Sequence, residues 1–114
     1  MQFESRELTD YAEPVPPTSL QEGEVYFSVQ YADGNLLVPI IETLVFVGRD
    51  LDGKDPALLY FQDVESHNRG IRYGSDGEEE ARFHLGREGK MFHIFNYEHL
   101  LDELMKCSLR RRRL

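Results

Sequence analysis

The densest group of reactive side chains in this chain lies between residues 63 and 70. Four of them alternate along the sequence: Asp63, Glu65, His67 and Arg69. If an extended strand continued through this segment, side chains two residues apart would share one face. Two carboxylates, an imidazole and a guanidinium on one face are suited to acid–base chemistry or to holding a small anion. The spacing therefore makes these four residues a candidate ligand-binding site.

The same segment has a second interpretation as a turn. The run from Ser66 to Gly70 is rich in side chains that bond to nearby backbone groups, and it ends on glycine. In a turn the four candidate side chains would diverge. A nucleophilic pair of Ser66 and His67 is disfavoured, because adjacent strand residues point to opposite faces. We therefore assign no catalytic residue, and ligand binding depends on whether the strand continues beyond Asp63.

Two histidines form a further candidate site, on an expected hairpin near the C-terminus. Matching apolar side chains across this hairpin pairs Phe83 with Ile94. That register makes His84 and His93 direct cross-strand neighbours on the opposite face. The pair could supply two metal ligands, but no third ligand is marked by spacing. We therefore expect no metal site.

The segment Asp50–Asp55 is similar in composition to a calcium-binding loop. Its glycine stands at the fourth position instead of the sixth, and Lys54 occupies a ligand position, so we interpret it as an acidic loop. The chain has no Gly-rich phosphate loop, CxxC pair, HExxH motif or nucleophile elbow. We therefore expect no cofactor. A non-enzymatic protein is favoured, and an enzyme stays open as the alternative.

Four consecutive arginines, Arg110–Arg113, follow the last apolar segment. Cations at a helix C-terminus complement its dipole. The same tail could contact nucleic acid or acidic lipid, fold back on acidic loops, or reach a neighbouring subunit. Without these arginines the chain has 9 basic and 21 acidic side chains, a formal charge of −12. Such a body repels nucleic acid and anionic membranes, so we expect neither as a partner.

Chain length and composition favour one soluble domain. A chain of 114 residues is typical of a single domain with its own core. The longest apolar run, residues 36–47, is interrupted by Pro39 and Glu42 and is too short to span a bilayer. The N-terminus lacks the basic and apolar regions of a secretory signal. A single cysteine, Cys107, cannot form an intramolecular disulfide, so we expect a cytoplasmic protein.

The first two strands are expected to form a hairpin. Residues 24–31 alternate apolar and polar side chains, and Asp33-Gly34 is typical of a two-residue turn. A turn centred there pairs Tyr31 with Leu36, Val29 with Val38, and Phe27 with Ile40. All three pairs place apolar on apolar. The second strand also carries Leu37 and Ile41 on its other face, which a second sheet, a helix or another chain must cover. We therefore treat Leu37 and Ile41 as a candidate interface.

The remaining pattern predicts four or five short strands and one helix. The strands are expected at residues 43–49, 57–64, 71–73, 81–85 and 91–95. The helix is expected over residues 97–109, with Asn96 as its N-cap and Cys107 buried on its apolar stripe. Residues 1–22 contain a Pro-rich stretch and are expected to form an extended or mobile arm. The domain then comprises residues 23–109, followed by the basic tail 110–114.

These elements predict an α+β fold that is mainly antiparallel β. We expect six or seven strands in a meander that forms a small barrel or two packed sheets, with the C-terminal helix covering one end or face. This order of elements resembles the architecture of pleckstrin-homology-like domains. The first turn, residues 32–35, is not basic and the terminal helix has no Trp, so phosphoinositide binding is not implied.

For function, the sequence favours a small protein-interaction module. It is expected to self-associate through the face of Leu37 and Ile41, or to act as an acidic inhibitor or immunity-type protein that neutralises a basic partner. The alternative is a small-ligand-binding protein or enzyme that uses the Asp63, Glu65, His67 and Arg69 cluster.

Overall fold

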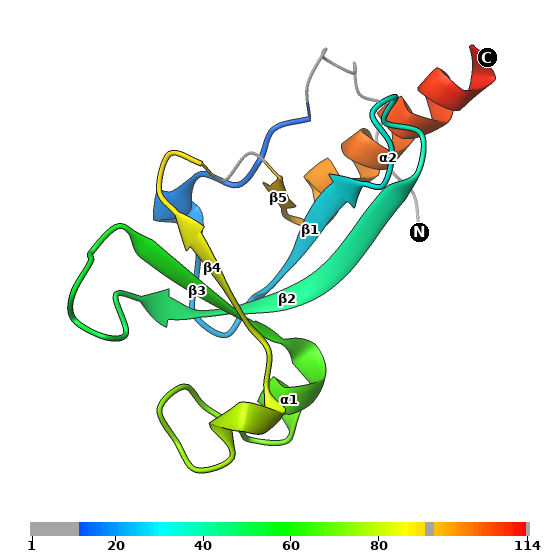
Figure 1. The fold of residues 1–114 in the computed structure, drawn as a ribbon. Helices are drawn as coiled ribbons and strands as arrows, with labels where there is room; N and C mark the ends of the chain where they lie inside the picture. Colours follow the sequence, from blue (N-terminus) through cyan, green and yellow to red (C-terminus); the bar gives the residue numbers. More distant parts are fainter. Residues whose placement is uncertain (1–11, 91–92, 114) are drawn as a thin grey trace.

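The computed structural model describes residues 12–90 and 93–113 and shows a five-stranded antiparallel sheet with one long helix packed against it (Figure 1). The sheet order is β4-β3-β2-β1-β5. The strands are β1 (Val25–Tyr31), β2 (Pro39–Arg49), β3 (Leu58–Asp63), β4 (Phe83–Arg87) and β5 (Ile94–Phe95). The helices are α1 (Val64–Asn68) and α2 (Tyr97–Arg112), with 3₁₀ turns at η1 (Pro17–Ser19) and η2 (Glu78–Glu80). The α+β class and the antiparallel sheet are confirmed.

The sheet has fewer strands than expected and is not a closed barrel. One long strand, β2, replaces two expected strands, and residues 71–73 are not a strand. The pairing of β2 with β3 shifts between Phe46 and Gly48, which marks a β-bulge. Gly48 has φ of 149°, and a Cβ there would lie 2.8 Å from Leu51 Cδ2. A bulge lets β2 bend and continue in the same sheet instead of ending.

The expected register of the first hairpin is wrong. The structure pairs Tyr31 with Pro39 and Val29 with Ile41, so the loop spans residues 32–38. The Asp33 carboxylate stabilises this longer loop by accepting hydrogen bonds from the backbone N–H groups of Leu37 and Val38. Leu36 has φ of 59°, whereas Gly34 is not in the left-handed region that a tight two-residue turn would require. The hairpin loop is therefore stabilised by the Asp33 side chain and does not form the expected two-residue turn at Asp33-Gly34.

The sheet buries a separate cluster on each face. Tyr26, Ser28 and Gln30 of β1 point to one face, here called the hollow face; Phe27, Val29 and Tyr31 point to the other, the helix face. The main cluster on the hollow face contains Val15, Leu20, Tyr26, Leu44, Phe46, Leu59, Phe61 and Ile94. The cluster on the helix face contains Ala12, Val29, Phe95 and Leu100, with Phe27, Tyr31 and Leu104 packed against it.

Part of the expected N-terminal arm belongs to the core. Ala12, Val15 and Leu20 are all buried. The N–H of Val15 donates to the carbonyl of Ile94 at 2.9 Å, so this segment runs along β5. Residues 1–11 lie outside the described residues. Within residues 12–22, the chain is therefore packed against the domain that was expected to begin at residue 23.

The expected last hairpin does not form, because β4 and β5 lie at opposite edges of the sheet. β4 pairs with β3, where His84 faces Phe61, and β5 pairs with β1, where Ile94 faces Ser28. The pairing of Phe83 with Ile94 is therefore wrong. Ile94 and Phe95 are both almost fully buried, on opposite faces. In its position between β1 and the N-terminal segment, β5 buries both side chains. Pairing β5 with the edge strand β4 would leave one of its sides uncovered.

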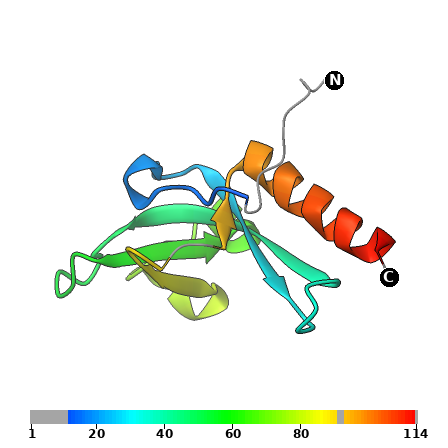
Figure 2. The ribbon, with the colours of Figure 1, turned by 90° about the horizontal axis from the view of Figure 1, so that it is seen from above.

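Helix α2 begins where the sequence predicts and packs on the helix face. The Asn96 side chain accepts a hydrogen bond from the N–H of His99 at 2.9 Å, which confirms the N-cap. Cys107 is buried as expected, and Leu100 and Lys106 are buried with it. Figure 2 shows α2 running beside the β1–β2 hairpin toward its loop. Within the described residues, no helix is long and apolar enough to cross a membrane.

Replacing Asn96 by alanine should lower the free energy of unfolding by about 1 kcal/mol, because the N–H of His99 loses its acceptor. Urea denaturation followed by circular dichroism measures this loss. Asn96→Asp is the control, since aspartate keeps the acceptor and should stay close to wild type. An equal loss in both variants would show that the cap is not the cause.

Candidate functional site

The 63–70 segment forms a capped helix instead of a continuing strand. β3 ends at Asp63, whose Oδ2 accepts a hydrogen bond from the N–H of Ser66 at 3.0 Å at the start of α1. The Ser66 hydroxyl donates to Asp63 Oδ1 at 2.6 Å, and the N–H of Arg82 donates to the same oxygen at 2.8 Å. Burial opposes ionisation of this carboxyl, but the hydrogen bonds outweigh it and lower its pKa to about 2. The Asp63 carboxylate therefore stabilises the start of α1 and the backbone at Arg82.

A fully buried glutamine continues this hydrogen-bond network into the core. Gln62 Nε2 donates to Ser66 Oγ at 2.8 Å and to the carbonyl of Ile71 at 2.9 Å. Gln62 and Ser66 are both completely inaccessible to solvent. Gln62 belongs to no motif that would mark it in the sequence; it stands at the end of an otherwise apolar run, Leu58–Phe61. Together these bonds fix α1 and the following loop against β3.

The structure does not bring the four candidate ligand-binding residues together. Glu65 is exposed, and His67 is half-buried with its pKa lowered by burial and by the nearby Arg72. Arg69 forms an exposed ion pair with Glu80, at 3.6 Å between Nη1 and Oε2. Residues two apart on a helix point about 200° apart and do not face each other. The shared face on which the ligand-binding prediction depended is therefore absent.

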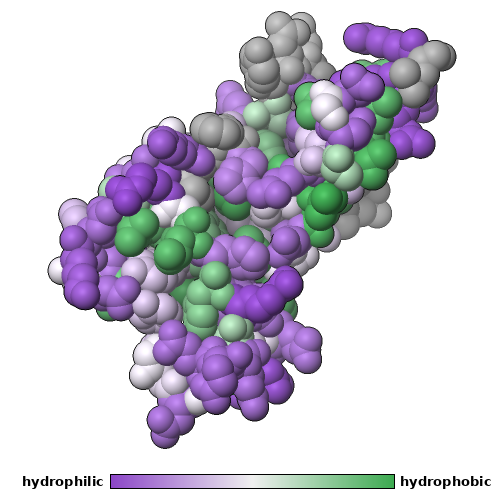
Figure 3. All heavy atoms as spheres, viewed as in Figure 1, coloured by the Kyte–Doolittle hydropathy of each residue, from purple (hydrophilic) through white to green (hydrophobic). Residues whose placement is uncertain are grey.

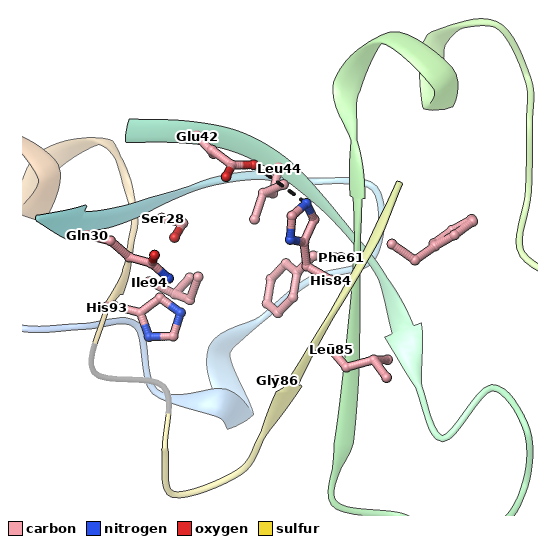
Figure 4. A pocket seen from close by; sticks show the side chains of 11 residues that line it. Ser28, Gln30, Glu42, Leu44, Phe61, His84, Leu85, Gly86, His93 and Ile94 are labelled. Carbon is pink, nitrogen blue, oxygen red and sulfur yellow. Dashed lines mark ion pairs between the residues drawn. The ribbon is translucent and has the colours of Figure 1, made fainter. Parts of the chain in front are cut away.

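A polar hollow lies instead between β4 and the β1–β5 side of the sheet, and is here called the β4–β5 hollow (Figure 4). Its volume is about 350 Å³. The apolar wall includes Leu44, Phe61 and Ile94, which belong to the core of the hollow face. The polar side chains around it are Ser28, Gln30, Glu42, His84 and His93. It opens because β4 and β5 are not paired with each other.

His84 and His93 both border this hollow, although they are not the cross-strand neighbours that were expected. His84 Nε2 lies 3.5 Å from Glu42 Oε2, and Arg82 Nη2 lies 3.4 Å from the same oxygen. Burial lowers the pKa of His93. Across residues 12–90 and 93–113, no three His, Cys, Asp or Glu side chains are placed to hold a metal ion. The hollow thus offers the Glu42 carboxylate, two histidine rings and the hydrogen-bonding side chains of Ser28 and Gln30.

The acidic loop between β2 and β3 is held by tyrosines. The hydroxyl of Tyr60 donates to Asp52 Oδ2 at 3.1 Å, and that of Tyr73 donates to both carboxylate oxygens. These hydrogen bonds, with some burial, raise the pKa of Tyr73 to about 12. The Asp52 carboxylate therefore fixes this loop to Tyr60 of β3 and to Tyr73.

A group of exposed apolar side chains lies at the end of the β1–β2 hairpin. Leu36, Val38, Ile40 and Ile41 are each between 43% and 49% exposed, and we call these four residues the hairpin tip. Of the two predicted interface residues, Ile41 is exposed and Leu37 is half-buried. Figure 3 shows apolar side chains gathered over this end of the molecule, beside α2.

The helix does not end at residue 109 as expected: Arg110–Arg112 form the last turn of α2, and the side chains of Arg110 and Arg111 reach this hairpin. Arg110 Nε donates to the carbonyl of Leu36 at 2.8 Å, and its Nη2 donates to the hydroxyl of Tyr31 at 2.8 Å. Arg111 Nη1 donates to the carbonyl of Leu37 at 2.9 Å. Burial and a hydrogen bond to Glu103 raise the pKa of Tyr31 to about 12. Two of the four arginines thus contact loop carbonyls, not the acidic loops considered from the sequence.

Comparison of the chain with protein-family models, with curated proteins and with solved structures finds no significant match. Function is therefore inferred from the geometry of this chain alone.

Acid should remove the contribution of the Asp63 cap. The folded-state pKa of about 2 lies below the ordinary value of 3.8, so this contribution is present above about pH 4 and is lost as the pH falls toward 2. Asp63→Asn should therefore be less stable than wild type at about pH 5, and the difference should shrink at about pH 2.5. Urea midpoints at both pH values measure it. Glu65→Gln, which removes an exposed neighbouring charge, is the control; a pH-independent gap for Asp63→Asn would contradict the assignment.

Proposed function

We propose that this chain is a small protein-interaction module that associates with a second copy of itself through the hairpin tip. The observation that carries this proposal is the concentration of four large apolar side chains, each between 43% and 49% exposed, within residues 36–41. Exposed apolar side chains gathered on one short segment are typical of protein–protein contacts, because their burial releases ordered water.

Both faces of β2 contribute to this surface. Ile40 lies opposite Gln30 on the hollow face, and Ile41 lies opposite Val29 on the helix face. Val29 on β1 is buried under α2, whereas its partner Ile41 on the neighbouring strand β2 is 43% exposed. A partner chain could therefore cover the tip from either side.

Hydrogen bonds within the chain hold the hairpin tip in one conformation in the unbound state. The Asp33 carboxylate accepts hydrogen bonds from the N–H groups of Leu37 and Val38. Arg110 and Arg111 donate to the carbonyls of Leu36 and Leu37 from the other side. A loop fixed in this way loses little conformational entropy on binding, which favours affinity.

Charge favours a second copy of the chain as the partner at this end. Residues 25–43, which hold β1, the loop and the first part of β2, and residues 97–113, which hold α2, together contain five acidic and five basic side chains. The rest of the chain contains sixteen acidic and eight basic side chains. A contact between two tips would therefore join neutral ends and keep the acidic bodies apart. A twofold axis lets one apolar patch serve both chains.

A basic partner, which the sequence also suggested, would contact the opposite end. Residues 50–80 contain nine acidic and three basic side chains, on the β2–β3 loop, α1 and η2. An inhibitor-type protein using these loops has no need of the hairpin tip. This alternative predicts a monomer whose acidic loops alone determine binding.

Sedimentation velocity over a concentration series tests the proposal. Wild type should form a dimer, and the double variant Ile40→Ser/Ile41→Ser should weaken it at least tenfold, since burying each isoleucine contributes roughly 1.5–3 kcal/mol. The dimer should persist at about 1 M NaCl, where contacts between exposed charges are screened. Leu85→Ser, which changes a 61% exposed residue on β4, is the matched control and should leave the dimer intact. A monomer at millimolar concentration, or a dimer unaffected by the double variant, would refute the proposal.

A further inference from the structure

The second surface of interest is the outer edge of β4, which is the last strand of the sheet on its side. The N–H of Glu88 donates to Ala57, and the N–H of Asp63 donates to Arg82. In an antiparallel ladder the direction of backbone groups alternates, so His84 and Gly86 bond to β3 and Phe83 and Leu85 point outward. Within residues 12–90 and 93–113, no hydrogen bond satisfies the outward backbone groups of Phe83 and Leu85. An edge strand with free donors and acceptors can pair with another chain.

The β4–β5 hollow adjoins this same edge. Phe83, His84, Leu85 and Gly86 all border it, so an added strand would run along its rim. Side chains of an added strand that lie opposite His84 or Gly86 would point to the hollow face of the sheet. At about 350 Å³ the hollow is near the lower limit of ligand pockets, which suits one or two side chains better than a large ligand.

The polar groups of the hollow favour a cationic side chain. Glu42 contributes a carboxylate, Ser28 is its cross-strand neighbour, and Gln30 and His93 border the same space beyond Ser28 (Figure 4). Glu42 Oε2 is approached by His84 at 3.5 Å and by Arg82 at 3.4 Å; the Arg82 side chain is 73% exposed, so its charge is largely screened and the carboxylate can still accept from a further cation. The formal charge of the chain, −8, also attracts a basic segment.

We propose that the free edge of β4 and the β4–β5 hollow bind an extended segment of a different protein by strand addition, with a lysine or arginine side chain of that segment in the hollow. This site is separate from the hairpin tip, so it can exist whether or not the chain forms a dimer.

Three synthetic peptides test the two parts of the site. The first is acetyl-Thr-Val-Arg-Val-Thr-amide; the second has glutamate in place of arginine; the third is the arginine peptide with N-methylated valines, which cannot donate in a ladder. Each is titrated into ¹⁵N-labelled wild-type protein and followed by NMR. The arginine peptide should shift the amide signals of Phe83, Leu85 and Ser28. The glutamate and N-methylated peptides should bind at least several-fold more weakly.

Two variants locate the binding on the protein. Glu42→Gln should weaken the arginine peptide by roughly two- to fivefold, the range for a partly exposed ion pair. Glu79→Gln makes the same change on exposed η2 and should have no effect. Leu85→Pro removes an outward N–H that does not bond to β3, and should weaken binding while Leu85→Ala does not.

The proposal is overturned if the arginine peptide leaves the β4 signals unchanged at millimolar concentration. It is also overturned if the glutamate or N-methylated peptide binds equally well to wild type, a comparison that does not depend on any variant folding. If Leu85→Pro abolishes the dimer, the free edge of β4 pairs with a second copy of this chain. That result would also overturn the proposal, because the occupant would then not be a different protein.

Discussion

The two-residue strand β5 is the constraint on which the rest of the structure depends. Ile94 and Phe95 are adjacent, so they point to opposite faces, and each is buried in a different core cluster. β1 pairs with this strand on one side, and the N-terminal segment bonds to it through Val15 on the other. A short strand buried on both faces has little freedom to move to another position. It therefore ties the hollow face, the helix face and the N-terminal segment together.

The two proposed binding surfaces both follow from this placement. Because β5 pairs with β1 and not with β4, the outer edge of β4 has no neighbouring strand, and the hollow lies beside that edge. Because Asn96 caps a helix directly after β5, α2 must start on the helix face and run toward the hairpin loop. There Arg110 and Arg111 brace the loop, and the hairpin tip is held away from the acidic part of the chain. The chain thus separates a neutral apolar end from an acidic end that carries a free strand edge.

The sequence was sufficient for elements whose signals are local. The N-cap Asn96 and the helical spacing of Leu100, Leu104 and Cys107 specify α2 without help from the rest of the fold. The first strand was also recognisable from its alternation. The 63–70 segment had a local signal too: Asp63 is a residue type that caps helices, and Glu65 is an acidic residue in the first turn, which favours a helix start.

Other features could not be predicted because they depend on competition between distant segments. The first hairpin follows the Asp33 side-chain cap instead of the Asp33-Gly34 turn, and this moved every expected pair. The β4–β5 hairpin matched apolar residues well, but burial of Ile94 and Phe95 beside β1 is more complete. Sequence spacing placed His84 and His93 on one hairpin, whereas the curl of the sheet brings them to one hollow from opposite edges. Gln62 gave no signal, since its partners become apparent only in the fold.

The most direct test of this account is a nuclear Overhauser measurement between α-protons. Ser28 and Ile94 face each other in the β1–β5 ladder as a pair not joined by backbone hydrogen bonds, which brings their α-protons close together. The account predicts a strong contact between the α-protons of Ser28 and Ile94. A contact between Ile94 and Phe83 in its place would show that β4 and β5 form a hairpin, which would close the edge and contradict the account.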